Sequence, residues 1–160
     1  MTEFIKNSWI PYLLFILFSC TGNSAIKTSG VDDYLKLGLE YFQDRKYQKA
    51  IEEFTYIIYN APVSEYADDA QFYIGESHFQ LKEYILAISE YQRLIRTHPQ
   101  SPLVEDARFK IGLSYFKLSP KYYHDQENTY KAIESFQEFL EDFPGSKYRD
   151  EAQQKIDICR

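Results

Sequence analysis

Residues 34–54 read YLKLGLEYFQDRKYQKAIEEF and carry two successive groups of apolar residues at helical spacing. Leu35, Leu39 and Phe42 belong to the first group, and Ala50 and Phe54 belong to the second. Apolar side chains three and four positions apart share one face of an α-helix, so each group indicates a helix with a buried face. The segment therefore predicts a helical hairpin.

This hairpin is repeated along the chain with a period of 37 residues. The dipeptide Leu37-Gly38 recurs as Ile74-Gly75 and again as Ile111-Gly112. The third copy finishes eight residues late, after an insertion near residues 119–128, and then resumes the same internal spacing. Stacked hairpins bury a continuous core, so the repeat predicts an all-α fold, an α-solenoid over residues 31–160 with about three hairpins and a partial fourth.

A glycine recurs in the first helix of each copy, although glycine lowers helix propensity by about 1 kcal/mol relative to alanine. A structural reason is needed, and close approach of the paired helix is the simplest one. We expect the glycines to meet small residues at one position of the second helix, namely Ala50, Ala87 and Ala132.

The hairpins are joined by three related segments, APVSEYADDA, HPQSPLVEDA and FPGSKYRDEA. Each has a proline, a serine two residues later, and two adjacent acids before an alanine. Proline ends one helix, and acids suit the amino-terminal turn of the next because of the helix dipole. We therefore expect dipole and capping roles, not general-acid roles, for Asp68-Asp69, Glu105-Asp106 and Asp150-Glu151.

The start of the chain has the pattern of a targeting segment. An apolar run of ten residues, Trp9–Phe18, follows Lys6 and is too short to cross a bilayer core, which needs about 20 residues. Residues 1–19 predict a secretory signal and residues 20–30 a flexible tether. Residues 17–20, LFSC, resemble a bacterial lipobox, except that the pattern prefers a smaller residue than Phe18. This resemblance implies lipid attachment at Cys20, and an ordinary cleaved signal or an uncleaved anchor are the alternatives.

Composition and motifs favour a binding protein over an enzyme. The formal net charge of −6 provides no basic stripe for phosphates, so we expect no nucleic-acid partner. The sequence has no phosphate-binding glycine loop, HExxH or CxxC, and no two histidines have ligand spacing on one helix. We therefore predict no catalytic residue, no metal site and no cofactor, and we expect His78 to be a packed, hydrogen-bonded histidine.

The first helices carry a second apolar stripe beside the one that packs inside each hairpin. We call this stripe the ladder, and its members are Leu35, Leu39, Phe42, Phe72, Glu76, Phe79, Phe109, Leu113 and Phe116. Two interpretations are open. The ladder is buried between adjacent hairpins, or part of it lines a groove that takes apolar side chains of an extended peptide.

The repeat resembles the tetratricopeptide repeat, whose pattern is an aromatic residue, Leu-Gly, Tyr, and later Ala, Phe and Pro. The first copy matches this pattern throughout, at Tyr34, Leu37, Gly38, Tyr41, Ala50, Phe54 and Pro62. In the later copies Gln71 and Arg108 occupy the aromatic position, and His78 occupies the tyrosine position in the second. The resemblance implies a solenoid whose concave side is lined mainly by first helices.

The lipobox, the proline-x-serine repeat ends and the segment Leu118–Ile156 together resemble the BamD (YfiO-type) lipoprotein family of the outer-membrane β-barrel assembly machinery. Asp125, Gln126 and Thr129 stand where that family carries Asp-Gln and Thr in its insertion. The resemblance implies a non-enzymatic protein, lipid-anchored at the periplasmic face of the outer membrane. Its implied partners are unfolded outer-membrane proteins and a BamA-like barrel subunit.

Family members continue with further hairpins, whereas residues 150–160 only begin a fourth first helix. The chain is thus either a fragment or a short variant. Two other classes of function remain as alternatives: a periplasmic repeat protein that coordinates the Tol-Pal system, and a glycan-binding repeat lipoprotein.

Overall fold

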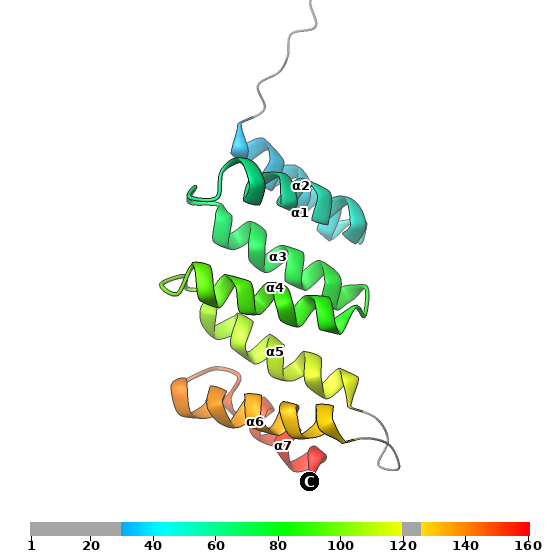
Figure 1. The fold of residues 1–160 in the computed structure, drawn as a ribbon, viewed down its shortest axis with the longest axis vertical. Helices are drawn as coiled ribbons and strands as arrows, with labels where there is room; N and C mark the ends of the chain where they lie inside the picture. Colours follow the sequence, from blue (N-terminus) through cyan, green and yellow to red (C-terminus); the bar gives the residue numbers. More distant parts are fainter. Residues whose placement is uncertain (1–29, 120–125) are drawn as a thin grey trace, which may run out of the picture.

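The computed structural model describes residues 30–119 and 126–160, and these residues form seven α-helices and no strand. The helices are α1 (Val31–Gln43), α2 (Tyr47–Asn60), α3 (Ala67–Gln80), α4 (Tyr84–Thr97), α5 (Val104–Leu118), α6 (Glu127–Asp142) and α7 (Arg149–Cys159). Each helix packs against the next in sequence, and the hairpins α1–α2, α3–α4 and α5–α6 follow one another in a single stack that ends with α7 (Figure 1). The predicted all-α solenoid is confirmed. No helix in the described part of the chain is long and apolar enough to cross a membrane.

The hydrophobic core runs through the stack because each cluster joins one hairpin to the next. The first cluster combines Phe54 and Ile57 of α2 with Ile74 of α3. The second combines residues of α4 with Ala107 and Ile111 of α5, and the third combines residues of α5, α6 and α7. A single hairpin would leave half of each cluster in water, so the hairpins depend on one another for stability.

The recurrent glycines of the first helices lie against aromatic rings of the second helices. A Cβ atom added to Gly38 would lie 2.6 Å from the Phe54 ring, and one added to Gly112 would lie 2.8 Å from the Phe136 ring. The glycine of the middle hairpin meets Tyr91 in the same way, at 2.6 Å. Close approach of the helices is confirmed, and the atoms nearest to each added Cβ belong to an aromatic ring of the second helix. Ala50, Ala87 and Ala132 are fully buried, and the ring four residues later reaches across to the glycine.

In two of the three proline-x-serine segments, the serine ties the connection that follows a hairpin to the first turn of that hairpin. Ser101 donates a hydrogen bond from its Oγ to Asp68 Oδ2 over 2.6 Å and accepts one from the backbone N–H of Leu103 over 3.1 Å. Ser146 repeats both bonds, donating to Glu105 Oε1 over 2.6 Å. Acids in the first turns of α3 and α5 thus accept bonds from a later serine, and no helix has a side-chain cap bond from its N-cap residue. The predicted first-turn position is confirmed. In α3, Asp68 Oδ1 also accepts a hydrogen bond from the first-turn backbone N–H of Asp69 over 3.0 Å.

The first copy lacks this tie. The residue that corresponds to Asp68 and Glu105 is Val31, which cannot accept a hydrogen bond. Ser64 Oγ is accordingly the one buried side-chain oxygen or nitrogen without a hydrogen-bond partner in the described residues. The same serine therefore has different energetic consequences in different copies.

Alanine substitution should change the free energy of unfolding differently at the three serines. We expect Ser101→Ala and Ser146→Ala each to lower the free energy of unfolding by about 1 to 2 kcal/mol, because each removes a hydrogen bond to a carboxylate. Ser64→Ala should leave stability unchanged or slightly raised, because it removes a buried hydroxyl that has no partner. Urea unfolding of the three variants measures the difference, and equal losses in all three would contradict the tie.

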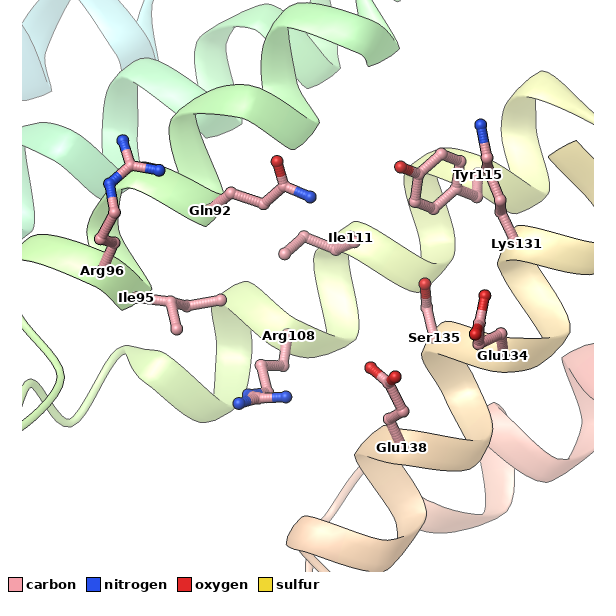
Figure 2. A pocket seen from close by; sticks show the side chains of 10 residues that line it. All are labelled: Gln92, Ile95, Arg96, Arg108, Ile111, Tyr115, Lys131, Glu134, Ser135 and Glu138. Carbon is pink, nitrogen blue, oxygen red and sulfur yellow. The ribbon is translucent and has the colours of Figure 1, made fainter.

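A pocket of about 460 Å³ opens between α4, α5 and α6 (Figure 2). Its floor includes Ile95, Ile111 and Tyr115, and α6 contributes Glu134 and Glu138 to its wall. Nothing in the repeat pattern predicted this hollow, which lies outside the ladder.

Candidate functional site

The ladder lies along the first helices α1, α3 and α5, as its register requires. Seven of its nine members are half-buried, namely Leu35, Leu39, Phe42, Phe72, Phe79, Leu113 and Phe116. Glu76 and Phe109 lie in the interior, with 8% and 2% of their surface exposed. The ladder is therefore partly packed between hairpins and partly open to solvent.

The three phenylalanines nearest the hairpin turns share one environment. The ring of Phe42 meets Tyr73 edge-on with centroids 5.3 Å apart, and Tyr73 belongs to the next first helix. Lys110 Nζ lies 5.0 Å from the centroid of Phe79 at the same register, and Lys155 Nζ lies 5.1 Å from that of Phe116. These three covering residues correspond to one another after the eight-residue insertion is allowed for. Each ring is thus partly covered by a residue of a later helix: α3 covers Phe42, α5 covers Phe79 and α7 covers Phe116.

Phe109 differs from its counterparts because it joins the core of the last hairpin. Its ring stacks on Tyr148 with centroids 4.3 Å apart and an interplanar angle of 6°. It also contacts Phe136 and Phe139 of α6. Phe109 is therefore a core residue, unlike the half-buried members of the ladder.

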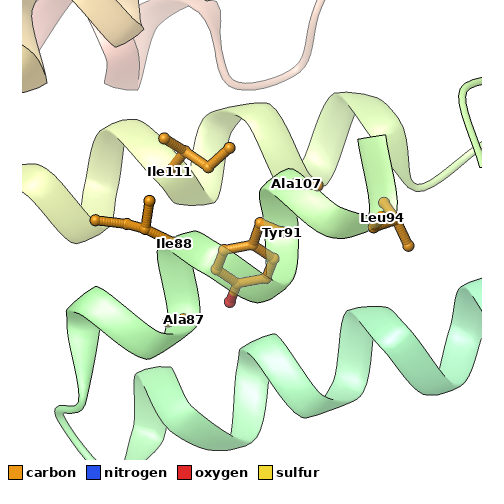
Figure 3. Close-up of a cluster of buried hydrophobic side chains, with 6 residues drawn as sticks. All are labelled: Ala87, Ile88, Tyr91, Leu94, Ala107 and Ile111. Carbon is orange, nitrogen blue, oxygen red and sulfur yellow. The ribbon is translucent and has the colours of Figure 1, made fainter. Parts of the chain in front are cut away.

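Glu76 is buried and has two polar partners, a tyrosine hydroxyl that donates a hydrogen bond and a lysine that supplies the opposite charge. Tyr91 Oη donates a hydrogen bond to Glu76 Oε1 over 2.5 Å, and Lys110 Nζ lies 2.8 Å from Glu76 Oε2. Figure 3 shows the Tyr91 ring inside the cluster that joins α4 to α5. Burial and the adjacent negative charge of Glu76 raise the pKa of the Tyr91 hydroxyl far above its usual range. The three residues connect α3, α4 and α5.

A register comparison could have found this network in the sequence. The other two hairpins carry Leu39 with Phe54 and Leu113 with Phe136 at the positions of Glu76 and Tyr91. Both polar departures from the repeat fall in one hairpin, which indicates that they interact.

The other predicted polar residues are accounted for by local bonds. His78 is half-buried and its Nδ1 lies 2.7 Å from Glu83 Oε2, so the prediction of a hydrogen-bonded histidine is confirmed. In the insertion, Thr129 donates a hydrogen bond from its Oγ1 to Gln126 Oε1 over 2.7 Å. The described residues hold no group of three or more His, Cys, Asp or Glu side chains placed to bind a metal.

The predicted lipid-attachment residue Cys20 lies outside the described residues, as do the predicted signal, residues 1–19, and all but the last residue of the predicted tether. Asp125 of the insertion also lies outside them. These predictions rest on the sequence.

Comparison with solved structures defines the class of protein. The crystal structure of MamA has a TM-score of 0.63 and 27% sequence identity to this chain, with 81% of this chain and 66% of MamA covered. The first tetratricopeptide domain of Spaghetti (RPAP3), solved with an HSP90 peptide, has a TM-score of 0.61 at 19% identity and covers 81% of this chain and 89% of its own. The chain spans just under two thirds of MamA. It is a helical-repeat protein of the tetratricopeptide type.

The sequence places the chain within a particular family of that class. Residues 31–160 match the YfiO family, which is described as outer membrane lipoprotein. The chain therefore belongs to the YfiO family of outer membrane lipoproteins. A comparison with curated proteins found no match.

Proposed function

We propose that this chain is a non-enzymatic adaptor of the β-barrel assembly machinery, anchored by lipid on Cys20 at the periplasmic face of the outer membrane. It holds segments of unfolded outer-membrane proteins and binds a BamA-like barrel subunit. Membership of the YfiO family supports this proposal over a Tol-Pal coordinator or a glycan-binding lipoprotein.

The observation that carries the binding role is the repetition of a half-buried ring in each hairpin. Phe42, Phe79 and Phe116 occupy one register on α1, α3 and α5, and the next first helix covers each ring on one side. An extended peptide presents apolar side chains at intervals, and a row of partly open rings offers one contact for each hairpin. Leu35, Leu39, Phe72 and Leu113 widen this surface, while Phe109 and Glu76 fix the helices beneath it.

Site-specific photocrosslinking tests the ladder as a peptide site. Gln43, Gln80 and Lys117 are exposed and each follows a ladder phenylalanine. With a photoreactive residue at these positions, a peptide from the aromatic-ended terminal strand of an outer-membrane barrel should crosslink. Phe79→Ala should lower the yield at position 80 several-fold, because the peptide loses an apolar contact.

Glu52 and Ser89 provide matched control positions, because both are exposed at one register of the second helices α2 and α4. Crosslinks confined to these two positions would overturn the ladder as the binding surface.

The lipid anchor is tested separately by labelling. In cells grown with labelled palmitate, the chain should carry the label, and Cys20→Ala should abolish it because acylation needs the cysteine thiol. The labelled chain should be recovered in the membrane fraction, since several acyl chains together give stable anchoring. An unlabelled chain, or label that survives Cys20→Ala, would contradict the anchor.

A further inference from the structure

The pocket between α4, α5 and α6 lies on a different face of α5 from the ladder. Arg108, Ile111 and Tyr115 line the pocket, whereas the ladder uses positions 109, 113 and 116 of the same helix. Successive residues of an α-helix are turned by about 100°, so the two sets of side chains leave α5 in directions more than a right angle apart. The pocket is thus a second surface, independent of the proposed peptide groove.

The repeat itself shows why a hollow forms in the third hairpin. In the second hairpin, Gln71 Nε2 donates a hydrogen bond to Glu90 Oε2 over 2.5 Å and so bridges α3 to α4. The corresponding residues of the third hairpin are Arg108 and Ser135, and both line the pocket. Ser135 is too short to form this bridge, and Arg108 instead pairs with Asp142 at 3.0 Å. The third hairpin therefore lacks the bridge at the position where the pocket opens.

The charges around the pocket favour a basic occupant on one side. Glu134 and Glu138 lie one turn apart on α6, and neither makes an ion pair or hydrogen bond within the described part of the chain. Arg108 is paired with Asp142, and Lys131 is paired with Glu127 at 2.5 Å. The α6 wall therefore presents two carboxylates whose charge is not neutralised locally.

The other residues that line the pocket are suited to contact an apolar side chain and a peptide backbone. Ile95, Ile111 and Tyr115 give the pocket an apolar floor, and Figure 2 shows Arg96 and Gln92 together on the side of α4. Arg96 has no ion-pair partner in the described residues and can donate to carbonyl oxygens. A volume of 460 Å³ lies within the usual range of ligand pockets.

We infer that this pocket binds a segment of a partner protein in which a large apolar side chain is followed or preceded by lysine or arginine. The apolar side chain enters between Ile95 and Ile111, and the cation pairs with Glu134 and Glu138. The backbone carbonyls of the segment accept hydrogen bonds from Gln92 and Arg96.

A set of fluorescein-labelled hexapeptides tests the inference against the full chain purified in detergent. The basic peptide has a central phenylalanine flanked by lysines, a second peptide has glutamates in place of the lysines, and a third has alanine in place of the phenylalanine. By fluorescence anisotropy, we expect the Kd of the basic peptide to be about three- to tenfold lower than that of the acidic one, as two partly screened ion pairs allow. The alanine peptide should bind at least tenfold more weakly, because it cannot fill the apolar floor.

The variant Arg108→Gln with Ser135→Glu transplants the Gln71–Glu90 bridge of the second hairpin into the third, so the fold already contains the same pair. This variant should lose binding of the basic peptide, although it makes the site more negative by two charges. Glu134→Gln with Glu138→Gln should remove the preference for lysine and leave weak binding of the phenylalanine. Phe79→Ala, which affects the ladder, should change none of these affinities, so the pocket is tested separately from the proposed function.

Three outcomes would overturn the inference. The transplanted bridge could leave the basic peptide bound as tightly or more tightly, which would show general attraction to an acidic surface. The acidic and basic peptides could bind equally, or no peptide could bind at millimolar concentration. Circular dichroism of each variant confirms that it is folded.

Discussion

An alanine in place of Phe136 is expected to lower the free energy of unfolding by about 3 to 5 kcal/mol. The ring is fully buried, and it packs against Phe109 with centroids 5.8 Å apart. Removing it leaves a cavity between α5 and α6, and the apolar contacts across that cavity are lost. Urea unfolding should show a lower midpoint, and because each core cluster joins a hairpin to the helix that follows it, the whole stack should respond.

Phe136→Ala is also expected to reverse the sign of the change in unfolding free energy that Gly112→Ala causes. In the wild-type chain, Gly112→Ala places a Cβ atom 2.8 Å from the Phe136 ring, and overpacking of this kind costs about 1 to 3 kcal/mol. With alanine at position 136 the space is free, and the higher helix propensity of alanine should then stabilise the chain by up to about 1 kcal/mol. A double-mutant cycle measures this change of sign.

Gly145 provides the control for the cycle, since a Cβ atom there would meet nothing within 4 Å. Gly145→Ala should change stability by only a few tenths of a kcal/mol. If Gly112→Ala had the same effect in both backgrounds, the ring would not be the reason for the glycine.

Alanine in place of Glu76 is expected to destabilise the chain by about 3 kcal/mol, near the lower end of values for broken buried ion pairs. The substitution leaves Lys110 Nζ without its partner at 2.8 Å and leaves the Tyr91 hydroxyl without its acceptor. Lys110 is 21% exposed, so water compensates part of the loss. Urea unfolding measures the effect.

The repeat supplies an uncharged replacement for the whole network. Glu76→Leu combined with Tyr91→Phe and Lys110→Tyr installs the residues that correspond to them in the first copy, Leu39, Phe54 and Tyr73. We expect this triple variant to unfold within about 1 kcal/mol of the wild type, because well-packed uncharged residues replace the whole buried ion pair at little cost. A loss as large as that of Glu76→Ala would show that the network contributes stability that packing cannot replace.

The raised pKa of Tyr91 gives this network a pH dependence at alkaline pH. In the unfolded chain the hydroxyl loses its proton near pH 10, whereas burial and Glu76 keep it protonated in the folded chain. Its contribution to stability is therefore complete below pH 10 and is lost as the pH rises further, by up to about 1.4 kcal/mol per pH unit. The stability difference between the wild type and Tyr91→Phe should shrink from pH 9 to pH 11, and a constant difference would contradict the raised pKa.

Several structural features could be predicted because they depend on spacing alone. Helical periodicity and the 37-residue repeat predicted the hairpins, the close approach at Gly38, Gly75 and Gly112, and the resumption of register after the insertion. The identity of the residue that meets each glycine was not predictable in the same way. The periodicity identifies which face of α2, α4 or α6 points inward, but the length of a side chain decides which residue on that face reaches the glycine.

The serine ties illustrate a second limit. The sequence shows the serines and the acids as separate parts of each connection, and Ser101 lies 33 residues from Asp68. The antiparallel packing of α3 and α4 returns the chain after α4 to the first turn of α3 and so brings the serine to the acid. The same geometry explains why Ser64 Oγ has no hydrogen-bond partner, because the first copy carries Val31 at the position of the acid.

By itself, the sequence established the repeat, because residues recur at a spacing of 37. It also established the helical hairpins and the register of the ladder, because both follow from the 3.6-residue turn of the α-helix. The tertiary structure decided which ladder residues are covered and where a pocket opens. Both depend on how the hairpins stack, since the same apolar stripe is buried at Phe109 and half-open at Phe79. The pocket is lined by Arg108 and Ser135, where the second hairpin has the hydrogen-bonded pair Gln71 and Glu90.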